Sequence, residues 1–310
     1  MLVIYEKCNE ITDDRIVAAL VGMTKAKCVA LVKPFEEADR AIQQERVEPG
    51  DIKHVKRGKP NGPLDTDEKQ RFFVLYDLKT YPTFDVLGFP FGFSGGHAHA
   101  HVDRLLPVLR RALAVLGVMP EQAAGTPSAF HNLMDKDQAI VIDGVECACV
   151  RPPDRTEQEH QYSGKKRPTV KALVVSDLNR KLRLLCGVVA GSVHDDALMK
   201  NVCKPGFSWF RKVRLGLDLG FLGADQDDHE AHIQWPHKQP RQSKKNPNPS
   251  LTPTQKQENR RQASTRVVVE HASGGMKTFH GLLHRIRNHL DTVVDDFFAL
   301  PAGLWNYKIS

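Results

Sequence analysis

Apolar residues recur with a helical period along the first 45 residues and again after residue 65. The segment TDDRIVAALVGMT predicts a helix, because Thr12 or Asp13 can cap its start and its apolar residues fall on one face. Further along, Asp65 and Glu68 fit a capping box ahead of a second helix, and Thr83 suits the cap of a short helix over 84–89.

A longer helix follows the glycine-containing turn FGFSGG. Its apolar residues keep a 3.6-residue spacing, and Pro107 is expected to kink or split it. The spaced residues are Val102, Leu105, Leu106, Leu109 and Leu113. Helix, short helix, turn and helix over residues 65–116 is the order of a helix-turn-helix.

Continuous apolar runs replace the helical period in the second half of the chain. Strands are predicted in QAIVIDGVECACV, PTVKALVVSD, KLRLLCGVVA and KVRLGLDLG, with a helix over DDALMKNV. A last helix is predicted from Thr252 as cap, Pro253 at the first position and Gln255 closing the capping box, loosened at Gly274 and Gly275. Successive strands followed by helices indicate an α/β architecture.

The charge of the chain indicates a polyanionic partner. Its formal net charge is +7, and the loop over 235–261 is basic, with Lys244 and Lys245 near its centre. Contact with phosphates and a merely solvated loop are both consistent with that loop. No apolar run reaches about 18 residues, and the start lacks the basic region of a signal peptide, so we expect no membrane partner.

Six cysteines without a CxxC pair are read as reduced thiols. Cys147 and Cys149 share one face of a predicted strand, where burial is favoured over a zinc site that would need two further ligands.

The segment GGHAHAHVD raises the question of a metal site. On a helix His97 and His101 share a face, whereas His99 points elsewhere. With no acid or cysteine spaced to join them, we favour a surface helix whose His97, His101 and Arg104 contact DNA. Exposed histidines with no role are the alternative.

Three carboxylates are placed to hold hard cations. Asp143 and Asp218 each end an apolar strand, where loss of water makes a carboxylate costly for stability, and Glu270 lies within the last helix. Asp195 competes with Asp218 but is expected to cap the helix that follows it. Along the last helix Arg266, Glu270, Gly274 and Lys277 fall close to one stripe, so the cations would hold phosphates.

Three acids around two cations suit phosphodiester cleavage. Each acid alone is weaker evidence, because the two aspartates could be turn residues and Glu270 a surface acid.

Five ordered motifs resemble transposases of the DDE superfamily, of the insertion sequence family five and Harbinger type. They are VIDGVECACVRP, YSGKKRPTVKALVVSD, GSVHDDALM, LDLGFLG and LTPTQKQENRRQASTRVVVEHASGGMKTF, and KTYPTFDVLGFPFGFS resembles the helix-turn-helix that precedes them. Pro168 stands where that family often has His, Pro90 interrupts the short helix, and GGHAHAH replaces a Ser/Thr/Arg-rich helix start.

The resemblance implies an α/β fold: a ribonuclease-H-like catalytic domain over 135–300, preceded by an all-α helix-turn-helix domain over 65–125. An N-terminal helical region and basic linker over 1–64 complete the expected domains. The catalytic and metal-binding triad falls on Asp143, Asp218 and Glu270, with two Mg²⁺ or Mn²⁺ ions.

The resemblance further implies hydrolysis at the ends of a DNA element and transfer of the freed 3′-hydroxyl into target DNA. The expected partners are double-stranded DNA, carrying inverted repeats and the target site, and further copies of the chain in a dimer or larger assembly. The expected location is the cytoplasm, on the nucleoid. Residues expected on DNA are Tyr162, Lys165, Lys166, Lys171, Lys244, Lys245, Arg266, Lys277, His97, His101 and Arg104.

Two other functions stay open from the sequence. One is a domesticated, transposase-derived DNA-binding protein, which the altered first domain favours and the intact triad disfavours. The other is a metal-dependent DNA endonuclease without strand transfer.

Overall fold

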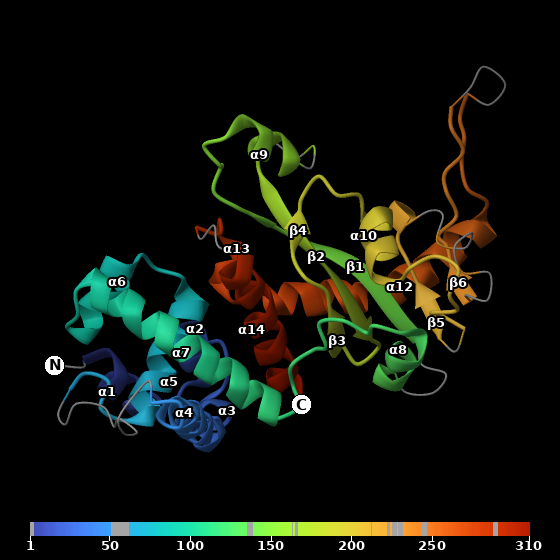
Figure 1. Ribbon diagram of the computed structural model, residues 1–310. Coiled ribbons are helices and arrows are strands. Elements are labelled where there is room, and N and C mark those ends of the chain that lie inside the picture. The colour runs from blue at the N-terminus through green and yellow to red at the C-terminus, as the bar shows by residue number, and fades with distance from the viewer. Residues whose placement is uncertain are drawn as a thin grey trace. The chain divides into compact units, whose positions relative to one another are not determined.

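The structure is a computed structural model that divides into two compact units (Figure 1). One unit comprises Met1–Met119 together with Met276–Ser310, and the other comprises Pro120–Gly275. The residues that the structure describes are 3–50, 62–134, 139–162, 164, 167–211, 213–221, 224, 228, 232–242, 247–287 and 291–310.

The first unit is built from helices in its described residues. The core contains aromatic side chains from several helices, such as Phe35, Phe72, Phe91 and Phe279. The helices are α1 (Val3–Glu10), α2 (Asp14–Val21), α3 (Lys25–Ala30), α4 (Val32–Val47), α5 (Asp67–Thr80), α6 (Phe84–Gly88), η1 (Phe89–Phe91), α7 (Gly95–Val115), α13 (His280–Leu283) and α14 (Asp291–Ile309).

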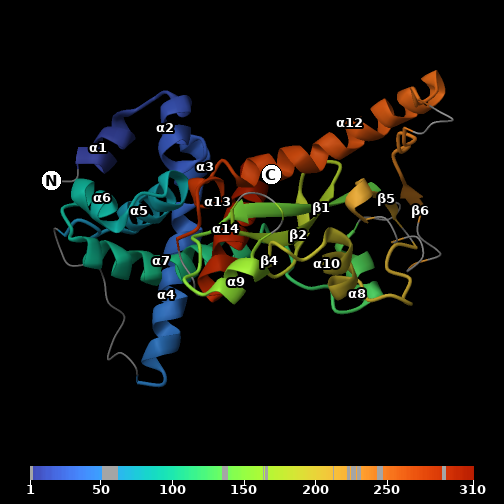
Figure 2. The same cartoon turned by 90° about the horizontal axis from the view of Figure 1, so that it is seen from above.

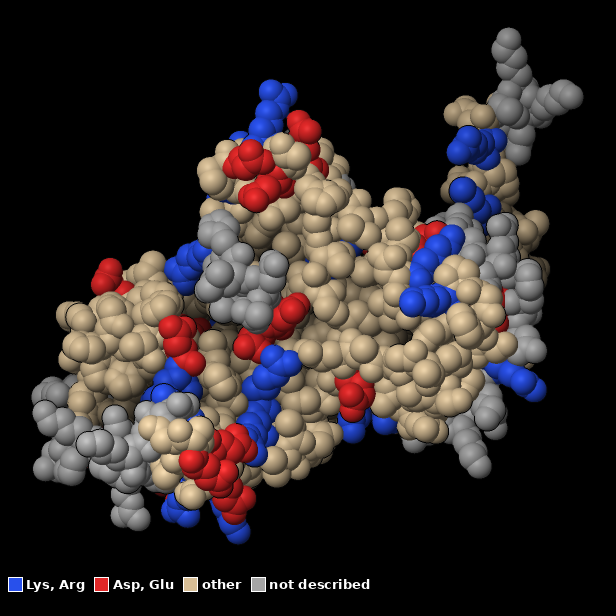
Figure 3. Space-filling model, in the orientation of Figure 1, with Lys and Arg blue, Asp and Glu red and all other residues tan. Residues whose placement is uncertain are grey.

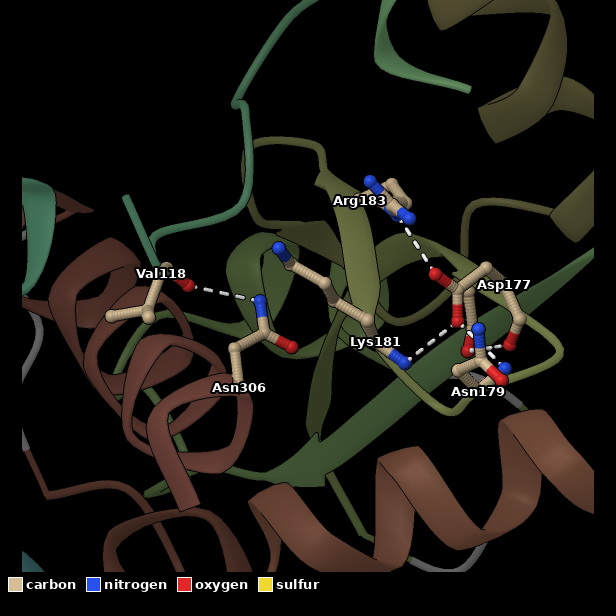
Figure 4. A network of polar contacts seen from close by, with 7 residues as sticks. Val118, Asp177, Asn179, Lys181, Arg183 and Asn306 are labelled. Carbon is tan, nitrogen blue, oxygen red and sulfur yellow. Dashed lines mark hydrogen bonds and ion pairs between the residues drawn. The ribbon is translucent and has the colours of Figure 1, made fainter. Parts of the chain in front are cut away.

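The C-terminal segment packs into this unit through close contacts. Gly22 ends α2 at φ +84°, and a Cβ there would lie 2.5 Å from the Phe279 ring, so only glycine allows the approach. The buried Asn306 amide of α14 donates to the Val118 carbonyl at 2.9 Å (Figure 4). Residues distant in sequence therefore complete one core.

Helices α5, α6 and α7 lie where the helix-turn-helix was predicted, and two local predictions need correction. Thr66, not Asp65, caps α5, because the Asp65 carboxylate is paired with Lys69 at 2.7 Å. Pro107 does not split α7, which runs unbroken from Gly95, since buried apolar residues on both sides of the proline hold the helix against the core. Thr83 caps α6 as predicted.

The second unit has a mixed sheet, which confirms the α/β class. Its strands run in the order β3-β2-β1-β5-β6, with β4 also paired to β2. The pairs β1–β2 and β2–β3 are antiparallel, whereas β1–β5 and β5–β6 are parallel. The strands are β1 (Ala139–Ala148), β2 (Thr169–Asp177), β3 (Leu182–Leu185), β4 (Val189–Ala190), β5 (Arg214–Gly216) and β6 (His232–Gln234).

Helices cover both faces of this sheet. In Figure 2, α12 (Pro253–Met276) runs over one face, and α8 (Pro127–Leu133) and α10 (Asp195–Val202) lie on the other. Ile140 and Ile142 of β1 share a core with Leu198 and Met199 of α10. Since successive side chains of a strand alternate, Asp143 points to the opposite face. The remaining described helices are α9 (Arg155–His160), in the β1–β2 connection, and η2 (Leu219–Phe221).

A buried carboxylate fixes the turn between β2 and β3 (Figure 4). Asp177 accepts hydrogen bonds from the backbone N–H groups of Asn179 and Lys181, at 2.8 and 3.0 Å. The Nε of Arg183 donates to its other oxygen at 2.8 Å. This fully bonded acid is structural, because its charge is met by donors within the turn.

None of the helices in the described ranges has the length and hydropathy needed to cross a bilayer.

Candidate active site

Parallel pairing of β1 and β5 brings Asp143 and Asp218 to corresponding places. The register pairs Ala139 with Arg214 and Val141 with Gly216, a constant offset of 75 residues (214 − 139). Asp143 and Asp218 continue that offset (218 − 143) just past the last pair. Both acids thus lie where the two strands separate, a usual place for a ligand in an open α/β sheet.

Asp143 is the most perturbed acid of this region. The pKa of its carboxyl is raised to about 6, chiefly by loss of water and also by nearby Asp195 and Asp218, whereas the Gly144 N–H, which donates at 2.8 Å, and Arg266 lower it. An acid buried among acids gains from a neighbouring cation, because the cation relieves both desolvation and repulsion.

Helix α12 supplies the third acid and a cation beside it. The helix begins at the predicted capping box: Thr252 N–H donates to Gln255 Oε1 at 3.0 Å, and Gln255 N–H donates to Thr252 Oγ1 at 3.2 Å. Arg266 Nη1 lies 3.2 Å from Asp218 Oδ1, and Nη2 lies 3.8 Å from Glu270 Oε1. The Arg266 guanidinium therefore lies between two of the three predicted acids.

Asp195 belongs to the same region, which the sequence reading missed. The prediction that it caps α10 is wrong: His194 occupies the cap position without a side-chain bond. Asp195 instead pairs with the buried Lys171 at 3.0 Å. A Cβ on Gly144 would lie 3.1 Å from Asp195 Oδ1, and one on Gly220 would lie 3.3 Å from Oδ2.

Glycines therefore make the space for this fourth carboxylate. One follows Asp143 directly and the other lies two residues after Asp218. In the sequence, a glycine closely following each of Asp143 and Asp218 was the signal that could have indicated space for a further side chain there.

The oxygen-only donor set fits a hard divalent cation such as Mg²⁺. Asp143, Asp218 and Glu270 are the residues that would hold it. Within the described ranges, no three His, Cys, Asp or Glu side chains are close enough to hold one ion, and Arg266 is the cation that meets Asp218 and Glu270.

The residues predicted to contact DNA lie in several different environments. Tyr162 is 51% exposed, Lys171 faces Asp195, and Lys277 lies just beyond the end of α12, so the expected helical stripe stops at Met276. Lys165, Lys166, Lys244 and Lys245 fall outside the described residues.

On α7 the predicted DNA-contacting residues have partners within their own unit. His97 Nδ1 lies 3.0 Å from Ser94 Oγ, and the ring of His101 packs on Phe93 with centroids 4.8 Å apart. Arg104 donates to Asp39 and Gln70, at 3.2 and 2.8 Å. These contacts give the three side chains local structural roles.

Comparison with known proteins links the second half of the chain to one family. Residues 142–306 match the family described as DDE superfamily endonuclease. The match spans 165 residues (306 − 142 + 1), just over half of the chain, and includes Asp143, Asp218 and Glu270. No match was found among curated proteins or among solved structures.

Proposed function

The chain belongs to the DDE superfamily of endonucleases, and on this basis we propose that it is a DNA transposase. It would hydrolyse phosphodiester bonds at the ends of a DNA element and join the freed 3′-hydroxyl to target DNA. The observation that carries the proposal is the 75-residue offset between β1 and β5, which Asp143 and Asp218 continue, together with Arg266, which pairs with both Asp218 and Glu270.

The residues have distinct roles in this proposal. Asp143, Asp218 and Glu270 would hold two divalent ions, Mg²⁺ or Mn²⁺, whose positive charge would stabilise the attacking and leaving oxygens. The Gly144 N–H orients the partly buried carboxylate of Asp143. Arg266 turns from the acids to a DNA phosphate when substrate binds, since its planar fork suits both partners.

The domain organisation belongs to the same proposal. A ribonuclease-H-like catalytic domain follows a helix-turn-helix over α5–α7, and the basic loop over 235–261 contacts phosphates. Two element ends must be held together for transposition, so we propose a dimer or larger assembly on DNA.

The test is a cleavage assay on labelled duplex carrying the DNA that flanks the gene. Protein is incubated with Mg²⁺ or Mn²⁺ beside the Glu270→Gln variant, with Glu6→Gln, which changes an exposed acid on α1, as the control. We expect cuts at a defined end with wild type and Glu6→Gln, and none with Glu270→Gln. Cutting that survives in Glu270→Gln contradicts the assigned site.

The same assay separates the two alternatives. Binding without cutting by either protein supports a domesticated DNA-binding protein. Cutting without joined products, when target DNA is supplied, supports an endonuclease that does not transpose.

A further inference from the structure

A basic pocket lies in the connection between β1 and β2, apart from the acidic site. Its volume is about 310 Å³, within the range of small-ligand sites. Its walls are Arg151, Arg155, Gln158, Tyr162, Arg167 and Pro168, with Glu159 at one side. Of this set, the sequence pointed to Tyr162 as a DNA contact and to Pro168 as a departure from the family pattern.

Two arginines of the pocket, Arg151 and Arg167, have guanidinium groups that are not paired with an acid within the described ranges. Arg155 is paired with Glu159 at 3.4 Å, but within the described ranges the side chains of Arg151 and Arg167 have no hydrogen-bond or ion-pair partner. The nearby Asp154 is occupied as the cap of α9, accepting from Glu157 N–H at 3.0 Å. Basic and acidic side chains therefore mix over α9 (Figure 3), while the pocket itself keeps a positive excess.

The backbone holds these arginines and the tyrosine in place. Cys149 N–H donates to the Pro168 carbonyl at 3.1 Å, and Thr169 N–H donates to the Gln161 carbonyl at 3.0 Å. Tyr162 and Pro168 also form a β-bridge. Arg151, Tyr162 and Arg167 each lie within two residues of one of these contacts, so backbone hydrogen bonds hold the chain beside all three.

We infer that this pocket binds one unpaired nucleotide of a DNA end, with its phosphate on Arg151 and Arg167 and its base against Tyr162. Arginine forks match phosphate oxygens, and an exposed aromatic ring beside cations is a platform for a base. Tyr162 is half exposed, so a base has access to its ring. The choice of a nucleotide over an acidic peptide rests on the proposed function, which makes DNA the substrate.

The test compares two DNA duplexes that differ only in a single-stranded tail. One is blunt, the other carries a three-nucleotide tail containing 2-aminopurine, and EDTA is present so that cleavage does not interfere. We expect wild type to bind the tailed duplex about tenfold or more tightly, with fluorescence quenched by stacking.

Variants assign that preference to the pocket. Tyr162→Ala and the double variant Arg151→Gln/Arg167→Gln should bind both duplexes equally, whereas Tyr162→Phe should keep the preference because its ring still stacks. Lys204→Gln/Phe207→Ala removes an exposed cation and an exposed aromatic outside the pocket and should behave as wild type.

The outcomes distinguish failure of the pocket assignment from failure of the proposed function. Equal binding of both duplexes by wild type overturns the pocket assignment, and so does a preference for the tailed duplex that persists in the pocket variants. The assignment also fails if an acidic decapeptide displaces the bound labelled duplex and unlabelled tailed DNA does not. A retained tail preference with no cleavage in Mg²⁺ or Mn²⁺ overturns the proposed function alone. Absence of binding to either duplex overturns both.

Discussion

Two carboxylates, one in each unit, have pKa values raised mainly by loss of water but lie in different surroundings: Asp77 is buried and Asp143 is partly buried. Burial raises the pKa of Asp77 on α5 to about 7 and that of Asp143 on β1 to about 6. The charge that acts on Asp77 is Arg287, which lies over the Tyr81 ring at 4.1 Å and donates to the Tyr81 carbonyl at 3.1 Å. Asp143 has two further acids near it.

The comparison shows that a raised pKa alone does not mark an active site. Desolvation acts on any buried acid, whereas repulsion from other acids requires that the fold gather them. Asp143 lies within β1, two residues past its last pair with β5, and its neighbours include Asp195 and Asp218. Asp77 lies within a helix that packs into an aromatic core. We therefore expect the two acids to respond differently to the same substitution.

The largest expected effect is on activity. Asp143→Asn should lower DNA cleavage by about 100-fold or more, because one of the three metal-holding carboxylates is lost. DNA affinity in EDTA should stay within about twofold. Single-turnover cleavage and fluorescence anisotropy measure the two quantities.

The matched substitution Asp77→Asn should leave cleavage within about twofold of wild type. If it lowers cleavage as strongly as Asp143→Asn, the distinction between a structural and a functional buried acid fails.

The next effect is on stability and has a defined sign with pH. The pKa of Asp77 in the folded state, about 7, exceeds the ordinary aspartate value of 3.8, so between about pH 4 and 7 the folded state keeps a proton that the unfolded state has lost. The contribution of Asp77 to stability therefore falls as pH rises through this window. Asp77→Asn removes that fall, so relative to wild type it should gain on the order of a few kcal/mol between pH 5 and 8.

Urea unfolding at several pH values checks this difference. Glu6→Gln, an exposed acid on α1, serves as control and should show a pH-independent difference from wild type. If the difference in free energy of unfolding between Asp77→Asn and wild type does not change with pH, the pKa of Asp77 is not raised by folding.

The smallest effect concerns the cation between Asp218 and Glu270. Arg266→Gln removes a charge that competes with a metal ion for both acids, so Mn²⁺ should bind about tenfold more tightly without DNA. Arg266→Lys keeps the charge and should change affinity less, and Arg260→Gln on an exposed part of α12 should change it little. Titration calorimetry with Mn²⁺ measures the three affinities, and an unchanged value for Arg266→Gln would place Arg266 outside the ion's reach.

The sequence alone determined the elements and the identity of the main acids. Helical periods, the Thr252–Gln255 capping box and the apolar runs are local patterns, and the structure has helices and strands there. Asp143 and Asp218 could be named because each closes an apolar run of the sequence, although β1 continues past Asp143 to Ala148. The family match confirms a DDE endonuclease. The helix-turn-helix, the domain boundaries and the site residues remain predictions.

Only the tertiary structure decided which side chains meet. Asp195 was read as a cap, but Lys171, 24 residues away, draws its carboxylate to the space beside Gly144 and Gly220. Arg266 was expected on DNA alone and is paired with Asp218 and Glu270. Arg151 and Arg167 come together only because a long connection folds back on itself. The physical reason is that periodicity shows which face of an element is buried, whereas the partner of a charge depends on the register and packing of distant segments.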